Sequence, residues 1–174
     1  MNKTKLKTSL FIVSSFLIPA IMMFFIYLSQ GIYWNSDTSP LLGDGYHQYV
    51  IFDTTLRNIL HGTDSLFYSF QSGLGINFYA LSSYYLGSFF SPLVYFFNAQ
   101  SMPDAVYLIT LLKFGAIGLS TYISLHGMFS KIPRSLVLTL STSFALMSFA
   151  ISQIEIKTWL DVLDRKSTRL NSSH

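Results

Sequence analysis

The stretch that decides the fold is Thr8–Leu28, which reads TSLFIVSSFLIPAIMMFFIYL and holds no charged residue. At about 1.5 Å of rise per residue, a helix of this length matches a bilayer hydrocarbon core of about 30 Å. A cleaved signal peptide is the competing interpretation. However, the apolar run is longer than the usual signal-peptide core of about 7–15 residues, and no small-x-small cleavage motif follows it at Gln30–Trp34. We therefore predict a transmembrane helix that is retained.

The composition of the chain also indicates a membrane protein. Hydrophobic residues make up 51% of its 174 residues and charged residues 11%, and the mean hydropathy is +0.43. Charges this sparse cannot solvate the surface of a water-soluble domain, so we predict an integral membrane protein in contact with the lipid bilayer. The net charge is only +3 and the basic residues are scattered, which argues against nucleic acid as a partner. Because cysteine is absent, disulfides and thiolate metal sites are excluded.

Two further stretches, 105–128 and 135–153, are apolar and long enough to cross the membrane. Lysines at positions 3, 5 and 7 precede the first stretch. Because basic flanks stay in the cytoplasm, we expect the N-terminus inside and residues 31–83 outside. The predicted fold class is an all-α, polytopic helical membrane protein whose extracytoplasmic loop bears interfacial amphipathic helices.

The stretch 80–99 decides the topology. It is about long enough to span, yet glycine, serine and proline interrupt it between residues 87 and 92, which favours a re-entrant or interfacial helix pair. If it spans, the basic loop with Lys131 and Arg134 falls outside. If it lies on the outer surface, that loop is cytoplasmic, as the positive-inside rule prefers. We favour the second arrangement, in which Asp161 emerges on the outer face.

The outer loop contains a second helical pattern. Bulky residues recur at helical spacing over Gln48–Leu60, with polar residues largely on the other side, and Gly62 suits a C-terminal cap. We predict an amphipathic helix in the interface. An i,i+4 pair of Asp53 and Arg57 would contribute about 0.2–0.5 kcal/mol to it. The dense aromatic residues between 68 and 85 are typical of a headgroup belt.

Asp44 lies between Gly43 and Gly45, where the backbone can approach a ligand closely. Its carboxylate suits a general base, but an Asx turn or a helix N-cap explains it as well. Nearby His47 can ligate a metal together with Asp44 or orient an acceptor, although an interfacial hydrogen bond is the commoner role of a lone histidine. Both interpretations of each residue remain open.

Lys113 is an ionisable residue inside the stretch 105–128. Such a charge costs about 2.5–3.5 kcal/mol at the centre of a span, and it is usually paired or extended toward an interface. Lys113 therefore either reaches the nearer interface or contacts a lipid phosphate or an acidic loop residue. Asp161 either meets Asp44 on the outer face as a second carboxylate or caps the next helix.

The segment 164–174 has one apolar residue and no periodicity. We interpret it as a non-native tail on a truncated reading frame, with a genuine polar C-terminus as the alternative. The chain shows no Gly-rich phosphate loop and no HExxH or GxSxG motif, so soluble nucleotide-binding and hydrolase functions have no support.

Several motifs resemble, in order, the N-terminal part of YfhO-type bacterial membrane proteins. They are Asp44–Tyr49 (DGYHQY), Leu56–Gly62 (LRNILHG), Gly73–Phe78 (GLGINF), Tyr84–Tyr85 with Ser91–Pro92, and Trp159–Asp161 (WLD). The resemblance covers nearly all of 1–163 and implies that this range is the N-terminal part of a polytopic domain. Family members are several times longer, so the chain is expected to be inactive alone.

Such proteins look like C-type glycosyltransferases, which take sugar from a polyprenyl-phosphate donor outside the membrane. The resemblance implies a fragment of such an enzyme in the bacterial cell membrane, with a cell-envelope polymer such as teichoic acid as the acceptor. Asp44 matches the position of the loop carboxylate of these enzymes. The expected site residues are Asp44 and Asp161 for catalysis, and His47, Gln48, Tyr49 and Lys113 for substrate binding. No cofactor is assigned, although a carboxylate in this role can position a divalent metal.

Two alternatives stay open. Broken helices with charges near the midplane also fit a transporter or flippase component for lipid-linked sugars, in which Lys113 and 80–99 line a path. A non-catalytic assembly subunit would need only helix faces made of small residues, which let helices approach closely. Such a face is formed by Gly115, Ala116, Gly118, Ser120 and Ser124.

Overall fold

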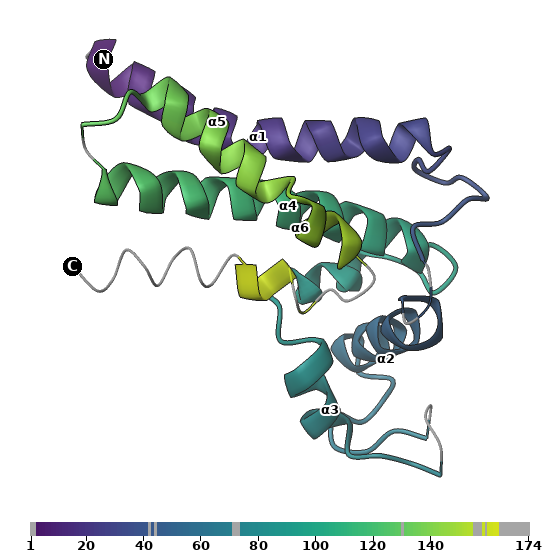
Figure 1. Ribbon diagram of the computed structural model, residues 1–174. Helices are drawn as coiled ribbons and strands as arrows, with labels where there is room; N and C mark the ends of the chain where they lie inside the picture. The colour runs from purple at the N-terminus through teal and green to yellow at the C-terminus, as the bar shows by residue number, and fades with distance from the viewer. Residues whose placement is uncertain are drawn as a thin grey trace. The chain divides into compact units, whose positions relative to one another are not determined.

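The computed structural model of the chain is helical (Figure 1). It describes residues 3–41, 43, 45–70, 74–129, 131–154, 158 and 160–163. Within these ranges the only β-pairing is an isolated bridge between Ser69 and Ile76. The predicted fold class, a helical membrane protein, is confirmed. The expected tail 164–174 lies outside the described residues.

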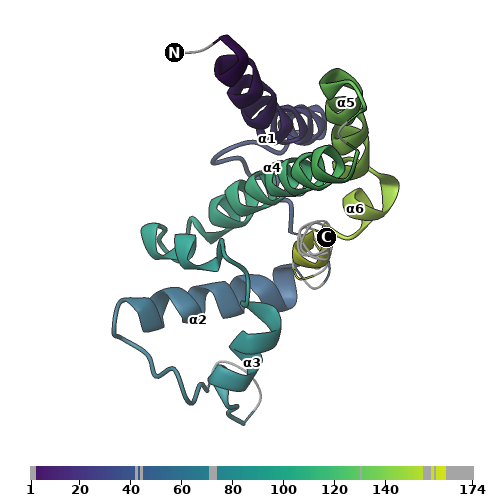
Figure 2. The ribbon, with the colours of Figure 1, turned by 90° about the vertical axis from the view of Figure 1, so that its left-hand side faces the viewer.

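The chain divides into two compact units. The first comprises Met1–Ile26, Leu111–Ile154 and Trp159–His174, and the second comprises Tyr27–Thr110 and Glu155–Thr158. In the first unit, helices α1 (Lys3–Ser29), α4 (Met102–Met128) and α5 (Arg134–Ala145) lie side by side (Figures 1 and 2). Helices α1 and α4 each continue into the second unit.

Among the described residues, three helical stretches are long and apolar enough to cross a membrane. They are Leu6–Ser29, Met102–Met128 and Arg134–Ser152. The third is not one continuous helix, because Met147 has an extended backbone between α5 and the short helix α6 (Ser148–Ser152). Neither glycine nor proline marks this break in the sequence.

α1 and α4 make a close backbone contact at Gly118. A Cβ atom added at Gly118 would overlap the carbonyl oxygen of Ser15 and the ring of Pro19. Because proline has no N–H, Pro19 removes the donor that the Ser15 carbonyl would normally bond within the helix. Because Gly118 has no side chain, α4 can cover this carbonyl of α1, which lacks its helical donor.

Gly115 provides a matched comparison for this contact. A Cβ atom there would lie 2.9 Å from the Phe16 ring, which can rotate away, whereas a backbone carbonyl cannot. We expect Gly118→Ala to lower the free energy of unfolding by about 2–3 kcal/mol through overpacking. Gly115→Ala should change it by less than about 1 kcal/mol, since better helix propensity offsets the clash. Denaturant titration of both purified variants checks this, and equal losses would contradict the backbone contact.

Residues 31–83, which are predicted to lie outside the membrane, form short helices in the second unit. The predicted helix Gln48–Leu60 is found in two parts, a π-helical turn over Gly45–Tyr49 and α2 over Val50–Leu60. Gly62 caps α2 as predicted, with φ of +77°. The Thr63 N–H donates to the Asn58 carbonyl at 3.0 Å, and the Gly62 N–H to the Ile59 carbonyl at 2.9 Å. These two bonds make a Schellman motif that ends the helix.

The stretch 80–99 holds two short helices instead of one long helix. α3 (Phe78–Tyr85) begins with Asn77, whose side chain accepts a bond from the Ala80 N–H at 3.2 Å, and a 3₁₀ helix follows over Ser91–Phe96. Proline at the second position of that helix fixes its start. The guanidinium Nε of Arg57 donates to the Phe97 carbonyl at 2.7 Å, which ties α2 to the end of this stretch.

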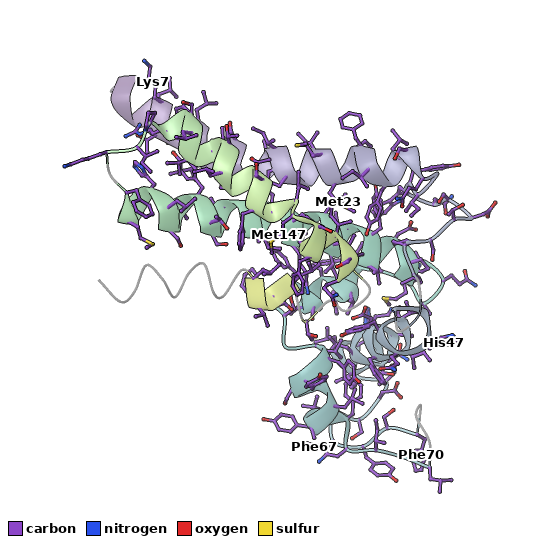
Figure 3. All side chains as sticks on the ribbon, in the orientation of Figure 1. Lys7, Met23, His47, Phe67, Phe70 and Met147 are labelled. Carbon is purple, nitrogen blue, oxygen red and sulfur yellow. The ribbon has the colours of Figure 1, made fainter. Side chains whose placement is uncertain are left out.

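The segments on the two sides of the Ser69–Ile76 bridge expose aromatic side chains. Ser69 and Ile76 exchange backbone bonds of 3.0 and 2.9 Å, while Gly75 adopts φ of +110° beneath the Tyr68 ring. Phe67 and Phe70 are 71% and 79% exposed and point outward (Figure 3). No charged residue occurs from position 65 to position 103. An exposed, uncharged aromatic surface of this kind suits a bilayer interface.

Candidate functional site

A buried ion pair is the best-defined polar feature of the first unit. The Lys113 Nζ atom lies 2.9 Å from Asp161 Oδ2. The lysine side chain is 3% exposed and the aspartate side chain 19%. Of the contacts expected for Lys113, contact with an acidic residue is the one that the structure shows.

This pair lies near the middle of α4. Lys113 is 11 residues after Met102 and 15 residues before Met128, so it lies about 16 Å from the start of the helix. The emergence of Asp161 on the outer face stays a prediction. α5 has 12 residues and covers about 18 Å before the chain leaves the helix at Leu146.

Apolar side chains fix the helical turn that carries Asp161. Leu160 and Leu163, on either side of it, are 1% and 9% exposed. On α4, Phe114 and Ile117 are fully buried. In such surroundings an unpaired charge would be costly, so the carboxylate at hydrogen-bond distance compensates the Lys113 ammonium group. The structure therefore holds a positive charge within a span and neutralises it with a partly accessible carboxylate.

The predicted residues of the outer loop differ in their surroundings. Asp44 lies outside the described residues. His47 is exposed on the π-helical turn (Figure 3), and Gln48 is half-buried. Tyr49 is 1% exposed, and its hydroxyl lies 3.3 Å from Thr158 Oγ1. Tyr49 is thus packed within this unit, and its role in substrate binding stays a prediction.

The burial of Tyr49 also affects its acidity. Loss of solvation raises the pKa of the Tyr49 hydroxyl, and the bond to Thr158 partly offsets this effect. The group therefore stays protonated at neutral pH and can donate a hydrogen bond. Thr158 was not predicted, because 109 residues separate the two partners and no local pattern connects them.

A known protein family matches most of the chain. The family described as bacterial membrane protein YfhO matches residues 14–163. This chain belongs to the YfhO family. No curated protein and no solved structure was found to match it. The matched range includes both partners of the ion pair and all of residues 31–83.

Among the described candidate residues of this YfhO-family chain, Lys113 and Tyr49 each have a partner within their own unit. Lys113 meets Asp161 in the first unit, and Tyr49 meets Thr158 in the second. Among the residues that the structure describes, no group of three or more histidine, aspartate or glutamate side chains is arranged to hold a metal ion. A metal held with Asp44 stays a prediction, because that residue is outside the described part of the chain.

Proposed function

We propose that this YfhO-family chain is part of a membrane glycosyltransferase. The enzyme would transfer sugar from a polyprenyl-phosphate donor to a cell-envelope polymer, such as teichoic acid, on the extracytoplasmic face. The Lys113–Asp161 pair is the observation that carries the proposal. Ionisable groups inside spans are costly and usually mark the path or site of a substrate. A cation at this place suits the phosphate of a lipid-linked donor.

In the proposed reaction, the acceptor hydroxyl oxygen forms a bond to the anomeric carbon while the bond from that carbon to the phosphate oxygen breaks. Asp44 takes the hydroxyl proton as a general base, which typically accelerates a reaction by about 10²–10⁴-fold. The Lys113 ammonium group stabilises the negative charge on the departing lipid phosphate. Asp161 neutralises that ammonium group while no donor is bound and is displaced from it by the phosphate.

A transporter or flippase for lipid-linked sugars is the second candidate. It is favoured by the interruption between α5 and α6, because discontinuous helices next to charges form many transport sites. In that case Lys113 and Asp161 would bind the headgroup during its passage, and Asp44 would not be needed. The response to Asp44→Asn therefore distinguishes the two candidate functions.

The extracytoplasmic location is tested with single cysteines, since the chain has none of its own. In intact cells, a membrane-impermeant maleimide is expected to label Asp44→Cys directly. Lys131→Cys should be labelled only after permeabilisation, because the basic loop stays inside. The reverse pattern would place Asp44 in the cytoplasm, where the proposed acceptor polymer is absent, and would overturn the proposal.

A further inference from the structure

Large apolar side chains are exposed around the Ser69–Ile76 bridge of the second unit. We call this group the aromatic tip, and its members are Phe67, Tyr68, Phe70, Leu74 and Tyr79. Leu74 is the most exposed of them, at 98%. Apolar side chains this close together are unfavourable in water, and a contiguous exposed patch usually marks a contact with a membrane or with another protein.

The exposed rings of the aromatic tip lie on more than one side of the bridge. Tyr68 packs edge to face against Phe70, with ring centroids 4.9 Å apart. Phe67 instead lies beside Tyr79, with centroids 6.3 Å apart, and the two phenylalanines are on different sides of this end of the unit (Figure 3). Because hydrophobic attraction is not directional, a lipid phase can cover every side of such a surface, whereas a protein partner covers one face.

The charge pattern also favours lipid. The sequence has no charged residue from position 65 to position 103, so insertion of the aromatic tip would bury no charge of this stretch. Asp64, which directly precedes it, accepts a hydrogen bond from Asn58 Nδ2 on α2 at 3.2 Å. The backbone is partly satisfied as well, because Ser69 and Ile76 exchange two hydrogen bonds. An irregular segment cannot lie deep in hydrocarbon, so the backbone belongs at headgroup level with only side chains below it.

The second unit is connected to membrane helices at both of its ends. It extends from Tyr27 to Thr110 and therefore contains the end of α1 and the start of α4. Both helices are long and apolar enough to cross a membrane. The uncharged stretch 65–103 continues into α4 without an intervening charge. The apolar phase next to this unit is therefore a lipid leaflet.

We infer that the aromatic tip inserts into the leaflet on the side of the membrane where α1 ends. The Phe70 and Leu74 side chains reach the upper acyl chains, while the hydroxyl groups of Tyr68 and Tyr79 stay among the headgroups. Tyrosine is enriched at this depth because its ring is apolar and its hydroxyl is polar. The insertion fixes the depth of the second unit at the membrane surface and does not rest on the proposed transferase.

A spin label measures the depth of the aromatic tip directly. The chain has no cysteine, and Leu74→Cys removes almost no packing contact because this side chain is exposed. The full chain is reconstituted in phosphatidylcholine vesicles, and collisions of the label with oxygen and with a polar nickel chelate are measured. Polar solutes are excluded from hydrocarbon, so the oxygen-to-nickel ratio should be at least about tenfold higher at position 74 than at Asp37→Cys, an exposed control in the same unit.

Two results at position 74 would overturn the inference. A ratio equal to that at position 37 would place the aromatic tip in water. Poor access of both reagents would show that another protein segment or a second copy of the chain covers it.

A charge placed within the aromatic tip tests the anchoring by its side chains. Phe70→Asp should lower the ratio at position 74 to within about twofold of that at position 37, because a carboxylate is excluded from hydrocarbon. Thr38→Asp adds the same charge at an exposed position of the unit outside the aromatic tip and should leave the ratio unchanged. An unchanged ratio in Phe70→Asp, or equal losses in both variants, would contradict insertion of the Phe70 side chain.

The lipid composition distinguishes apolar insertion from attraction between charges. Phosphatidylglycerol in the vesicles, or salt at about 0.5 M, should change the ratio at position 74 by less than about twofold, because the stretch 65–103 has no charge to be attracted or screened. A larger change with either would show that electrostatic attraction holds the unit at the membrane, and the inference would be wrong.

Discussion

Asp161→Leu is expected to lower the free energy of unfolding by about 3–5 kcal/mol, because it removes the carboxylate that pairs with the buried Lys113 ammonium group. Lys113→Met removes the cation instead and leaves a carboxylate that is already partly exposed. Its cost should therefore be smaller. Denaturant titration of the purified protein in detergent measures both losses.

The double variant Lys113→Met/Asp161→Leu separates stability from function. Replacing a buried ion pair by apolar side chains of similar size is often neutral or stabilising, so the double variant should regain most of the stability lost in Asp161→Leu. Sugar transfer should stay lost, because no cation remains to stabilise the phosphate. The polymer is analysed in a strain that carries only the altered gene. If both stability and glycosylation return, the pair is structural and the proposed role of Lys113 is wrong.

The second large effect is expected at Asp44. Asp44→Asn keeps the shape of the side chain but removes its ability to accept a proton, so sugar incorporation should fall by at least about 10²-fold. Membrane abundance of the protein should not change. Asp37→Asn is the control, since Asp37 is exposed in the same outer loop and loses the same charge. Sugar content of the isolated polymer, with immunoblots of the membranes, provides the measurement.

The location of the lipid-linked sugar in the Asp44→Asn strain tells the candidate functions apart. A transferase without its base leaves the donor unused in the outer leaflet, where an impermeant lectin or oxidant reaches it. Retained glycosylation in this strain would refute the assignment of Asp44 as the base. The flippase would be supported if glycosylation is retained in the Asp44→Asn strain but lost in a Lys113→Met strain, with the donor trapped in the inner leaflet.

The fold was predictable where local chemistry decides it. Apolar length predicts helices that can cross the membrane, because a bilayer leaves the backbone no other hydrogen-bond partners. The serines, glycine and proline between 87 and 92 predict that 80–99 does not form one helix, and Gly62 predicts the end of α2. In each case, the residues that predict the structural feature lie within a few positions of that feature in the sequence.

The site was only half predictable, for a physical reason. Lys113 stands out because it is a charge in an apolar run, but its partner lies 48 residues further along the chain. Which acidic residue reaches it depends on the break after Ala145, where the sequence has neither glycine nor proline. The pairing of Tyr49 with Thr158 is hidden for the same reason, since tertiary packing determines it.

The contact of Gly118 with the Ser15 carbonyl has a consequence for biogenesis. α4 begins about seventy residues after α1 ends, so at a synthesis rate of about 5–20 residues per second α1 enters the bilayer roughly 4–15 s before α4 exists. During that interval lipid surrounds a carbonyl that lacks its usual helical donor. A membrane insertase that binds newly made helices would shield the Ser15 carbonyl from lipid until α4, which carries Gly118, has been synthesised.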